Sequence, residues 1–353
     1  MAADIPEVLF ERRGAAGIIT LNRPQTLNAV TLGMVGALTR QLSEWEQDGA
    51  VTRVIITAAG DRAFSAGGDL RALFELGRAR HYQAALTYWR TEYVLNALIK
   101  RYRKPYLALI DGIVMGGGAG ILIHGSHRVA GDRFVFAMPE VGIGFFPDVG
   151  ATWFLPRLPG ELGLYLALTG ERLDAADGVL SGIATHRVAS QRFADLIEAL
   201  CGNVPVDALL GGFAELPGEG TWPARRTAID RLLAGDSVEG ILAALDAEAV
   251  AGGTNADFAR SAAAAIRRKS PTSLKIALAQ LRRGRSLDFT ECMRTEFRIV
   301  SRLLLQHDLY EGIRSVIIDK DQAPHWQPSS LEAVSASEVA RYFAPQPDEL
   351  ALP

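Results

Sequence analysis

The sequence predicts an α/β fold in its first half, followed by a mainly helical region. Two observations support this prediction. Runs rich in β-branched residues, such as VTRVIITA at 51–58, alternate with amphipathic stretches in the first half of the chain. After that, helical periodicity continues but strand-like runs disappear. We therefore expect an α/β core with the active site at 1–188 and a mainly helical region at 189–353.

The N-terminal elements follow from local patterns. Residues 8–21 alternate apolar and polar side chains around Gly14 and Gly17, which predicts a hairpin. The stretch 31–48 places apolar residues three and four positions apart, as an amphipathic helix does. Residues 51–58 then form a strand, and 69–100 are predicted to be largely helical.

The next elements contain the glycine-rich segments. KPYLALIDGIVMGGG at 104–118 predicts one strand that enters a glycine turn. AGILIHGSHRVAGD at 119–132 is predicted to continue as a buried helix, and FVFAMPE at 134–140 as a short strand.

The helical region divides into two parts. Residues 189–265 combine helical stretches with a connecting segment dense in glycine and proline. Residues 266–353 contain the pair Ser270–Pro271, which is typical of a helix start. Helices follow to about Leu305, and one short helix is expected in the tail.

Composition excludes several classes of partner. The chain has 353 residues and a net charge of −3, so it offers no electrostatic basis for binding nucleic acid or an anionic membrane. Cys201 and Cys292 are too few and too far apart for a disulfide framework or a metal cluster. The N-terminus lacks the apolar core of a signal peptide, and no apolar run is long enough to span a membrane. We expect a cytoplasmic protein.

Two carboxylates lie in an otherwise apolar segment. MPEVGIGFFPDVG at 138–150 contains Glu140 and Asp148, and acids are rarely buried without a partner. Glu140 could instead cap the turn after its proline, and Asp148 could be the turn residue of Pro-Asp-x-Gly. If the segment lines a pocket, burial should raise the pKa of these acids and make one of them a useful base.

Two glycine clusters, FSAGGDL at 64–70 and MGGGAG at 115–120, have no match to a phosphate-binding loop or a dinucleotide fingerprint. They are either tight turns or the two halves of an oxyanion hole, in which each backbone N–H contributes roughly 3–4 kcal/mol of transition-state stabilisation. No Gly-x-Ser-x-Gly elbow occurs, and Ser65 has no suggestive histidine partner, so ester cleavage would rely on carboxylates. Asp69 is expected to cap the following helix.

Together these blocks resemble the crotonase (enoyl-CoA hydratase/isomerase) superfamily. FSAGGDL, KPYLALIDGIVMGGGAG and FAMPEVGIGFFPDVGA follow one another in the order of that superfamily, and LNRPQTLNAV is similar to its opening signature. The resemblance implies a spiral of ββα units, acyl-CoA thioester substrates, and an oxyanion hole made by the N–H groups of Gly68 and Gly117. It also implies that CoA binds near Arg23, Leu27 and Ala66.

The resemblance also bears on the reaction. Hydratases of this superfamily use two glutamates, at positions that correspond to Gly120 and Glu140 here. One member of the acid–base pair is therefore missing, which disfavours hydration. An isomerase needs a base near this loop, which Glu140 or Asp148 could supply, so an enoyl-CoA isomerase stays open.

Asp148 stands where hydratases carry glycine, and here the chain resembles the 3-hydroxyisobutyryl-CoA hydrolases of valine degradation. YWRTEYVLNALIKRYRKP, SPTSLKIALAQL and HDLYEGIRSVIIDKDQAPHWQP extend this resemblance. It implies thioester hydrolysis in which Glu140 is the nucleophile or the base, Asp148 binds the substrate hydroxyl or orients water, and Glu92 lies at the acyl end.

The resemblance implies no metal and no redox cofactor, because CoA is part of the substrate. It implies a homo-oligomer, a trimer or hexamer, unless the longer C-terminal region covers the chain's own pocket. A non-catalytic acyl-CoA-binding protein is the remaining alternative, although the intact carboxylates and glycines argue against it. His124 and His127 are expected to be structural.

Overall fold

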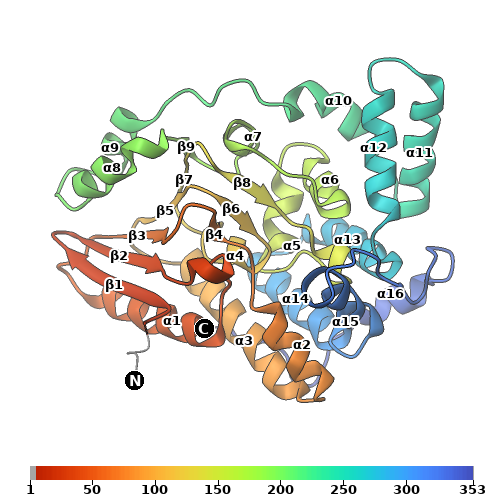
Figure 1. The fold of residues 1–353 in the computed structure, drawn as a ribbon, viewed down its shortest axis with the longest axis horizontal. Helices are drawn as coiled ribbons and strands as arrows, with labels where there is room; N and C mark the ends of the chain where they lie inside the picture. Colours follow the sequence, from red (N-terminus) through yellow and green to blue (C-terminus); the bar gives the residue numbers. More distant parts are fainter. Residues whose placement is uncertain (1–4, 353) are drawn as a thin grey trace. The chain divides into compact units, whose positions relative to one another are not determined.

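The computed structural model describes residues 5–352, which form two units that interleave along the chain (Figure 1). The first unit takes in the chain up to Asp69, Thr91–Phe136 and Leu173–Gly220. The second takes in Leu70–Arg90, Ala137–Arg172 and the chain from Thr221.

The first unit is built on a six-stranded sheet. Its strand order is β1-β2-β3-β5-β7-β9. Only β1 and β2 are antiparallel, with Phe10 opposite Ile19, and this confirms the predicted hairpin. The remaining neighbours are parallel. The strands are β1 (Val8–Arg13), β2 (Ala16–Leu21), β3 (Arg53–Ala58), β5 (Tyr106–Ile110), β7 (His127–Ala130) and β9 (His186–Arg187).

A second sheet has three strands, which alternate along the chain with strands of the larger sheet. It consists of β4 (Ala63–Ser65), β6 (Ile113–Met115) and β8 (Val135–Ala137), in that order. From β3 onward, successive strands therefore alternate between the two sheets. This alternation makes the chain wind as a spiral in which each turn adds one strand to each sheet, as expected for ββα units.

Two predictions about this region were wrong in detail. Residues 104–118 form two strands rather than one, because Gly112, with φ of +145°, redirects the chain from one sheet to the other. The predicted helix at 119–132 is mostly absent: α4 spans only Gly117–Gly120, and His127–Ala130 is strand β7, parallel to β5. A short apolar run does not distinguish a buried strand from a buried helix, and here strand pairing decided the outcome.

Helices cover both faces of the larger sheet. Helix α1 (Leu32–Gln47) begins at Thr31, whose hydroxyl accepts a hydrogen bond from the Met34 N–H. It approaches the sheet so closely that a β-carbon on Gly17 would lie 2.5 Å from the Trp45 ring. Helices α8 and α9 pack on the other side (Figure 1), where their leucines join a cluster with apolar residues of β2, β3, β5 and β7. The other helices here are η1 (Pro24–Thr26), α7 (Ala175–Ser181), η4 (Ser190–Arg192), α8 (Phe193–Leu200) and α9 (Val206–Phe213).

The second unit is almost entirely helical, and α13 is at its centre. Helix α13 packs against α5, α6 and α16, and α14 packs against α5 and α16. Ser270 caps α13 by accepting a hydrogen bond from the Ser273 N–H, which confirms the predicted helix start. The helices are α2 (Leu70–Arg78), α3 (Tyr82–Lys100, which continues into the first unit), η2 (Glu140–Ile143), α5 (Ala151–Phe154), η3 (Leu155–Arg157), α6 (Leu162–Thr169), α10 (Trp222–Leu232), α11 (Val238–Ala251), α12 (Ala256–Arg267), α13 (Pro271–Gly284), α14 (Phe289–Leu303), α15 (His307–Ile313), the π-helix η5 (Arg314–Ile318) and α16 (Ala336–Tyr342).

The change from strands to helices occurs near the expected place. Strand β9 ends at Arg187, and the described residues after it form helices and loops. The two units nevertheless interleave, so the division at residue 188 describes the order of elements along the chain, and as a domain boundary it stays a prediction.

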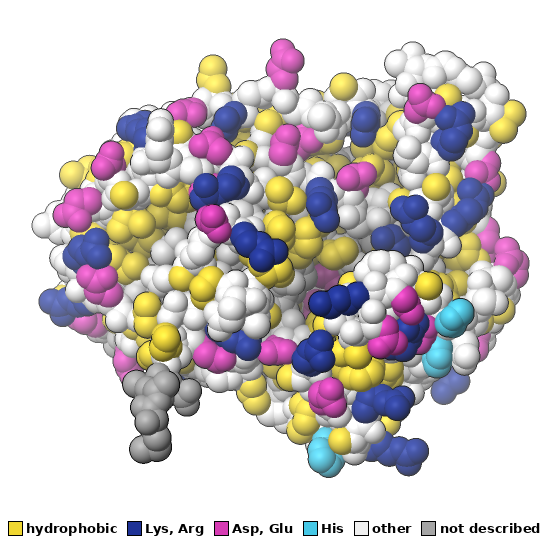
Figure 2. Space-filling view, viewed as in Figure 1, with side chains coloured by type: hydrophobic (Ala, Val, Ile, Leu, Met, Phe, Trp, Pro, Cys, Tyr) yellow, Lys and Arg dark blue, Asp and Glu magenta, His cyan; other side chains and the backbone are white. Residues whose placement is uncertain are grey.

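Charged side chains of both signs are mixed on the surface. Basic and acidic side chains are interspersed on the face that Figure 2 shows. No helix among residues 5–352 is long and apolar enough to cross a membrane. Within the same residues, no group of three or more His, Cys, Asp or Glu side chains could hold a metal ion.

Candidate active site

The first part of the site is the backbone around Gly68. Val30 brackets this glycine: its N–H donates to the Gly67 carbonyl (2.8 Å), and its carbonyl accepts from the Asp69 N–H (2.9 Å). The LNRPQTLNAV segment thus holds the FSAGGD loop through backbone bonds on both sides of Gly68. The orientation of the Gly68 peptide is therefore set before any ligand binds.

Gly117 lies beside Gly68. It is the first residue of α4, where a backbone N–H has no acceptor within the helix. A β-carbon on Gly117 would lie 3.1 Å from the Gly68 nitrogen and 2.8 Å from Oε1 of Glu92. No described residue accepts a hydrogen bond from the N–H of Gly68 or Gly117. The structure thus brings three of the predicted residues together and leaves two neighbouring N–H groups available to an oxygen.

Glu92 is on the buried side of α3. Its exposed fraction is 1%, which excludes the ordinary solvated role of a helix glutamate. One turn further along α3, the Asn96 Nδ2 donates to the Gly120 carbonyl (3.1 Å), so α3 is fastened to α4. Gly120, which the resemblance matches to the first glutamate of the hydratases, is itself buried. This position therefore presents only its backbone.

The residues predicted to lie near CoA come from neighbouring segments. The Ala66 N–H donates to the Leu27 carbonyl (3.0 Å), which brings these two residues together. The guanidinium of Arg23 donates to the Ala29 carbonyl (2.7 Å) and pairs with Glu7 (2.9 Å). Arg23 thus helps to hold this segment, and its contact with CoA stays a prediction.

The loop 138–150, which contains the candidate residues Glu140 and Asp148, belongs to the second unit. Its 3₁₀ helix η2 (Glu140–Ile143) is followed by the C-cap residue Gly144, whose φ of +68° favours glycine. A β-carbon on Gly144 would overlap the Asp308 carbonyl, and one on Gly312 would overlap the backbone of Ile143. The loop and α15 therefore touch backbone to backbone. This contact gives a structural reason for the HDLYEG block of the sequence.

Glu140 is a buried acid with no hydrogen-bond partner. Its exposed fraction is 4%, and neither carboxyl oxygen is bonded to a described residue. Asp148 is also buried, with 3% exposed. Burial raises the pKa of Glu140 well above its ordinary value, and the nearby charges of Asp148 and Glu296 raise it further. The expected rise in pKa is therefore confirmed for Glu140, and a carboxyl of this kind is suited to proton transfer near neutral pH.

Apolar rings pack on this loop. Phe145 stacks on Trp89 with 5.7 Å between ring centroids, and it also packs against Phe146 at 4.7 Å. All three side chains are buried or nearly so. These rings make the loop that contains Glu140 apolar, and burial is the largest cause of the raised pKa of Glu140.

The sequence analysis missed Glu296 on α14. This acid is fully buried, and its Oε2 and Oε1 accept hydrogen bonds from the N–H groups of Gly150 and Thr152, both at 2.8 Å. Burial and the charge of Asp148 raise its pKa to about 8. A signal was available, because Glu296 interrupts the apolar helix face formed by Met293, Phe297 and Val300.

Other candidate residues have structural roles. The Ser65 hydroxyl donates to the Asn28 carbonyl (2.9 Å), and no bond joins it to a histidine. His124 is buried, and the His127 ring bonds to Asp207 (3.0 Å), as expected for structural histidines.

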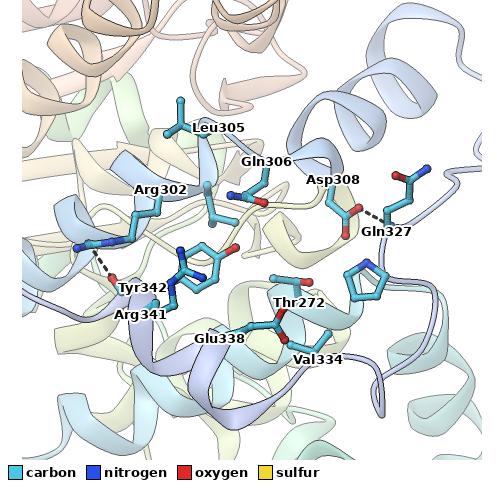
Figure 3. Close-up of a pocket in the computed structure, with 12 residues that line it drawn as sticks. Thr272, Arg302, Leu305, Gln306, Asp308, Gln327, Val334, Glu338, Arg341 and Tyr342 are labelled. Atoms are coloured by element: carbon cyan, nitrogen blue, oxygen red, sulfur yellow. Dashed lines mark hydrogen bonds between the residues drawn. The ribbon is translucent and has the colours of Figure 1, made fainter.

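A separate pocket of about 280 Å³ lies between the C-terminal helices of the second unit (Figure 3). Its polar groups already hold chain segments in place. The Arg302 guanidinium donates to the Tyr342 carbonyl (3.3 Å), and the Gln327 N–H donates to Asp308 (2.7 Å), as the dashed lines in Figure 3 mark. We assign this pocket no chemistry.

Comparison with known proteins places these features in a family context. A family model described as enoyl-CoA hydratase/isomerase matches residues 16–343. The chain is 44% identical over 348 residues to a mitochondrial 3-hydroxyisobutyryl-CoA hydrolase of Danio rerio, covering 96% of this chain and 89% of that protein. The corresponding Homo sapiens protein is 41% identical over 347 residues, with 96% and 88% covered.

Solved structures are similar over almost the whole chain. A carnitinyl-CoA dehydratase from Mycobacterium thermoresistibile has 40% identity and a TM-score of 0.92, covering 98% of this chain and 99% of its own. An enoyl-CoA hydratase from Rhodobacter sphaeroides 2.4.1 has 39% identity and a TM-score of 0.91, covering 98% and 100%. These likenesses confirm the predicted fold class.

Proposed function

The chain belongs to the enoyl-CoA hydratase/isomerase family, and on this basis we propose that it hydrolyses the thioester of 3-hydroxyisobutyryl-CoA, or of a close 3-hydroxyacyl-CoA, to the free acid and CoA. One observation carries the proposal: the only acid of the hydratase pair that is present, Glu140, is buried without a partner and shares its loop with the buried Asp148.

The family relatives support two reactions, and residue 120 favours one of them. The curated relatives are named 3-hydroxyisobutyryl-CoA hydrolases, whereas the two solved structures are named a dehydratase and a hydratase. Addition of water to a double bond needs an acid and a base. With Gly120 at the first carboxylate position, the chain lacks one of them, so hydrolysis is the better proposal.

In this proposal the thioester oxygen accepts hydrogen bonds from the N–H groups of Gly68 and Gly117. Negative charge develops on that oxygen as the tetrahedral intermediate forms, and unpaired N–H groups that are already oriented stabilise it without reorganising. The bonds that bracket Gly68 and the start of α4 supply that orientation. Glu92, beside Gly117, would lie at the acyl end of the substrate.

Glu140 has two alternative roles. As a nucleophile, its carboxylate attacks the carbonyl carbon, the C–S bond breaks, CoA leaves as a thiolate, and water then hydrolyses the mixed anhydride. As a base, it takes a proton from the water that attacks the carbonyl directly. Asp148 would bind the substrate hydroxyl or orient this water. Both routes give the same products and need neither a metal nor a redox cofactor.

The acyl-CoA substrate is the one partner that this mechanism requires. A homo-oligomer, trimer or hexamer, and a cytoplasmic location remain part of the proposal. The curated relatives are named as mitochondrial proteins, so location is to be measured for this chain separately.

Release of free thiol tests the proposed function. Purified protein is incubated with 3-hydroxyisobutyryl-CoA, crotonyl-CoA and acetyl-CoA, and CoA is followed with a thiol-reactive dye. We expect the first substrate to release CoA fastest. Loss of the enoyl absorbance of crotonyl-CoA without thiol release would support a hydratase instead, and conversion of a 3-enoyl-CoA without thiol release would support an isomerase. Binding of acyl-CoA without turnover of any of these substrates would indicate a non-catalytic binding protein.

A further inference from the structure

Glu296 is a fully buried acid that no proposed step of the reaction uses. It accepts hydrogen bonds from two backbone N–H groups, those of Gly150 and Thr152, at 2.8 Å each. Gly150 is two residues after Asp148, and Thr152 lies in the first turn of α5. The carboxyl of Glu296 therefore binds the backbone segment that directly follows Asp148.

This backbone has an unfavourable conformation. Val149 has φ of +52° and Gly150 has φ of +91°, so two consecutive residues lie in the left-handed region. A β-branched residue in that region is strained, by about 1–3 kcal/mol. Such strain persists only where surrounding contacts outweigh it, and the two bonds to Glu296 are contacts of this kind.

A second tether comes from α13. The buried Gln280 donates from Nε2 to the Pro147 carbonyl (2.6 Å) and to the Thr152 hydroxyl (2.7 Å). Pro147 precedes Asp148, whereas Gly150 follows it. The chain is thus held on both sides of Asp148 by two side chains of C-terminal helices. The side chain from α13, Gln280, is neutral, and the one from α14, Glu296, is an acid.

We propose that Glu296 is a positioning residue that holds Asp148 in place for hydrolysis, by binding the N–H groups of Gly150 and Thr152. The inference rests on the proposed function and deepens it. Glu296 acts through Asp148. Loss of the hydrogen bonds that Glu296 accepts should therefore affect the reaction in the same way as a displacement of Asp148.

The charge of Glu296 has a second consequence. The charge of Glu296 raises the pKa of Glu140 and, on its own helix, the pKa of the Cys292 thiol, and the charge of Asp148 raises the pKa of Glu296 itself. Helix α5 has no ionisable side chain, and α13 presents the neutral Gln280. The charges of α16, Glu338 and Arg341, line the pocket of Figure 3 beside Arg302, about 9 Å further along α14. Because the pKa of Glu296 is raised to about 8, its carboxyl becomes charged as the pH approaches 8, and from there upward removing that charge should lower the pKa of Glu140.

The first experiment compares pH profiles of kcat/KM for the wild type, Glu296→Gln and the matched control Gln280→Leu. Both variants lose one tether of the same loop, so we expect kcat to fall by about 10²-fold, as for a displaced catalytic group. Only Glu296→Gln should also shift the part of the profile near and above pH 8, where the wild-type Glu296 is charged, to lower pH. A Glu296→Gln enzyme with the wild-type kcat and profile would overturn the proposal.

A double-mutant cycle tests whether Glu296 acts through Asp148. Residues that act as a unit show non-additive effects, so Glu296→Gln should lower kcat/KM much less in the Asp148→Asn background than in the wild type. Equal effects in both backgrounds would contradict the inference. If Glu296→Gln does not fold, Glu296→Asp keeps the charge but shortens its reach. It should lose kcat without shifting the profile, and wild-type kcat would refute the proposal.

Amide hydrogen exchange separates this inference from the proposed function. The N–H groups of Gly150 and Thr152 should exchange slowly in the wild type and faster in Glu296→Gln, irrespective of any substrate. If the wild type released no CoA, the hydrolase proposal would fail. Amide exchange alone would then decide whether Glu296 holds the backbone after Asp148. Unchanged protection in Glu296→Gln would then refute it.

Discussion

The carboxylate of Glu92 lies against Gly117, so that a β-carbon at position 117 would be 2.8 Å from its Oε1 and 3.1 Å from the Gly68 nitrogen. Because position 117 has no side chain, the carboxylate of Glu92 and the N–H groups of Gly68 and Gly117 can lie close together. Glycine is required there for close approach rather than for an unusual φ.

Gly117→Ala should reduce thioester hydrolysis while the protein still folds. The added methyl displaces Glu92 or the Gly68 peptide, and loss of one oxyanion donor costs about 10²–10³ in kcat. The matched control is Gly211→Ala, because Gly211 is an exposed helical glycine with nothing within 4 Å of a β-carbon. Equal kcat values in the two variants would remove Gly117 from the proposed oxyanion hole.

Glu140→Gln should abolish most of the activity without unfolding the protein. The variant keeps the size of the side chain but has neither a nucleophile nor a base, so kcat should fall by at least ~10²–10⁴. Glu75→Gln, at an exposed glutamate of α2, is the control and should behave as the wild type. Circular dichroism checks the fold of both variants. Near-wild-type hydrolysis by a folded Glu140→Gln protein would disprove the mechanism.

Asp148→Asn should change substrate preference more than overall activity. Residual turnover is expected, with the largest loss on substrates that carry a 3-hydroxyl, because a site built to bind a hydroxyl can reject the analogue without it by up to about 10⁴–10⁵. The measurement is kcat/KM on 3-hydroxyisobutyryl-CoA and on an unsubstituted acyl-CoA. A uniform loss on both would argue that Asp148 orients water instead of reading the hydroxyl.

Gly120→Glu should not create a hydratase. It restores a second carboxylate in the sequence, but Gly120 is buried and its carbonyl is bonded to Asn96, so a new acid there would be buried at a cost in stability. We expect a lower melting temperature and no hydration of crotonyl-CoA. Measurable hydration would show that the missing glutamate alone separates the two reactions.

Stability should fall as the pH rises from about 4.5 to about 8. The pKa of Glu296 is raised from 4.5 to about 8, so in this window the folded protein keeps a proton that the unfolded chain has released. Each such group lowers the free energy of unfolding by up to ~1.4 kcal/mol per pH unit, and the raised pKa of Glu140 acts in the same direction. Urea denaturation at pH 5 and pH 8 measures the free energy of unfolding of both proteins. Relative to the wild type, that of Glu296→Gln should be higher at pH 8 than at pH 5. A difference that does not change with pH would contradict the raised pKa.

The sequence by itself determined the features that depend on neighbouring residues. The hairpin at 8–21 and the start of α13 at Ser270 follow from local patterns, and both are confirmed. The candidate residues Gly68, Gly117 and Glu140 were identified because the short contiguous motifs that contain them resemble those of the crotonase superfamily. Such a resemblance is visible within a few neighbouring residues, so no knowledge of the packing was needed to notice it.

Only the tertiary structure decided which distant segments meet. The stretch 119–132 contains a strand rather than a helix because β7 pairs with β5, a choice that an apolar run does not encode locally. Glu296 was missed because its partner Gly150 is 146 residues away. Burial and the nearby charge of Asp148, which raise the pKa values of Glu140 and Glu296, exist only once these segments have packed together.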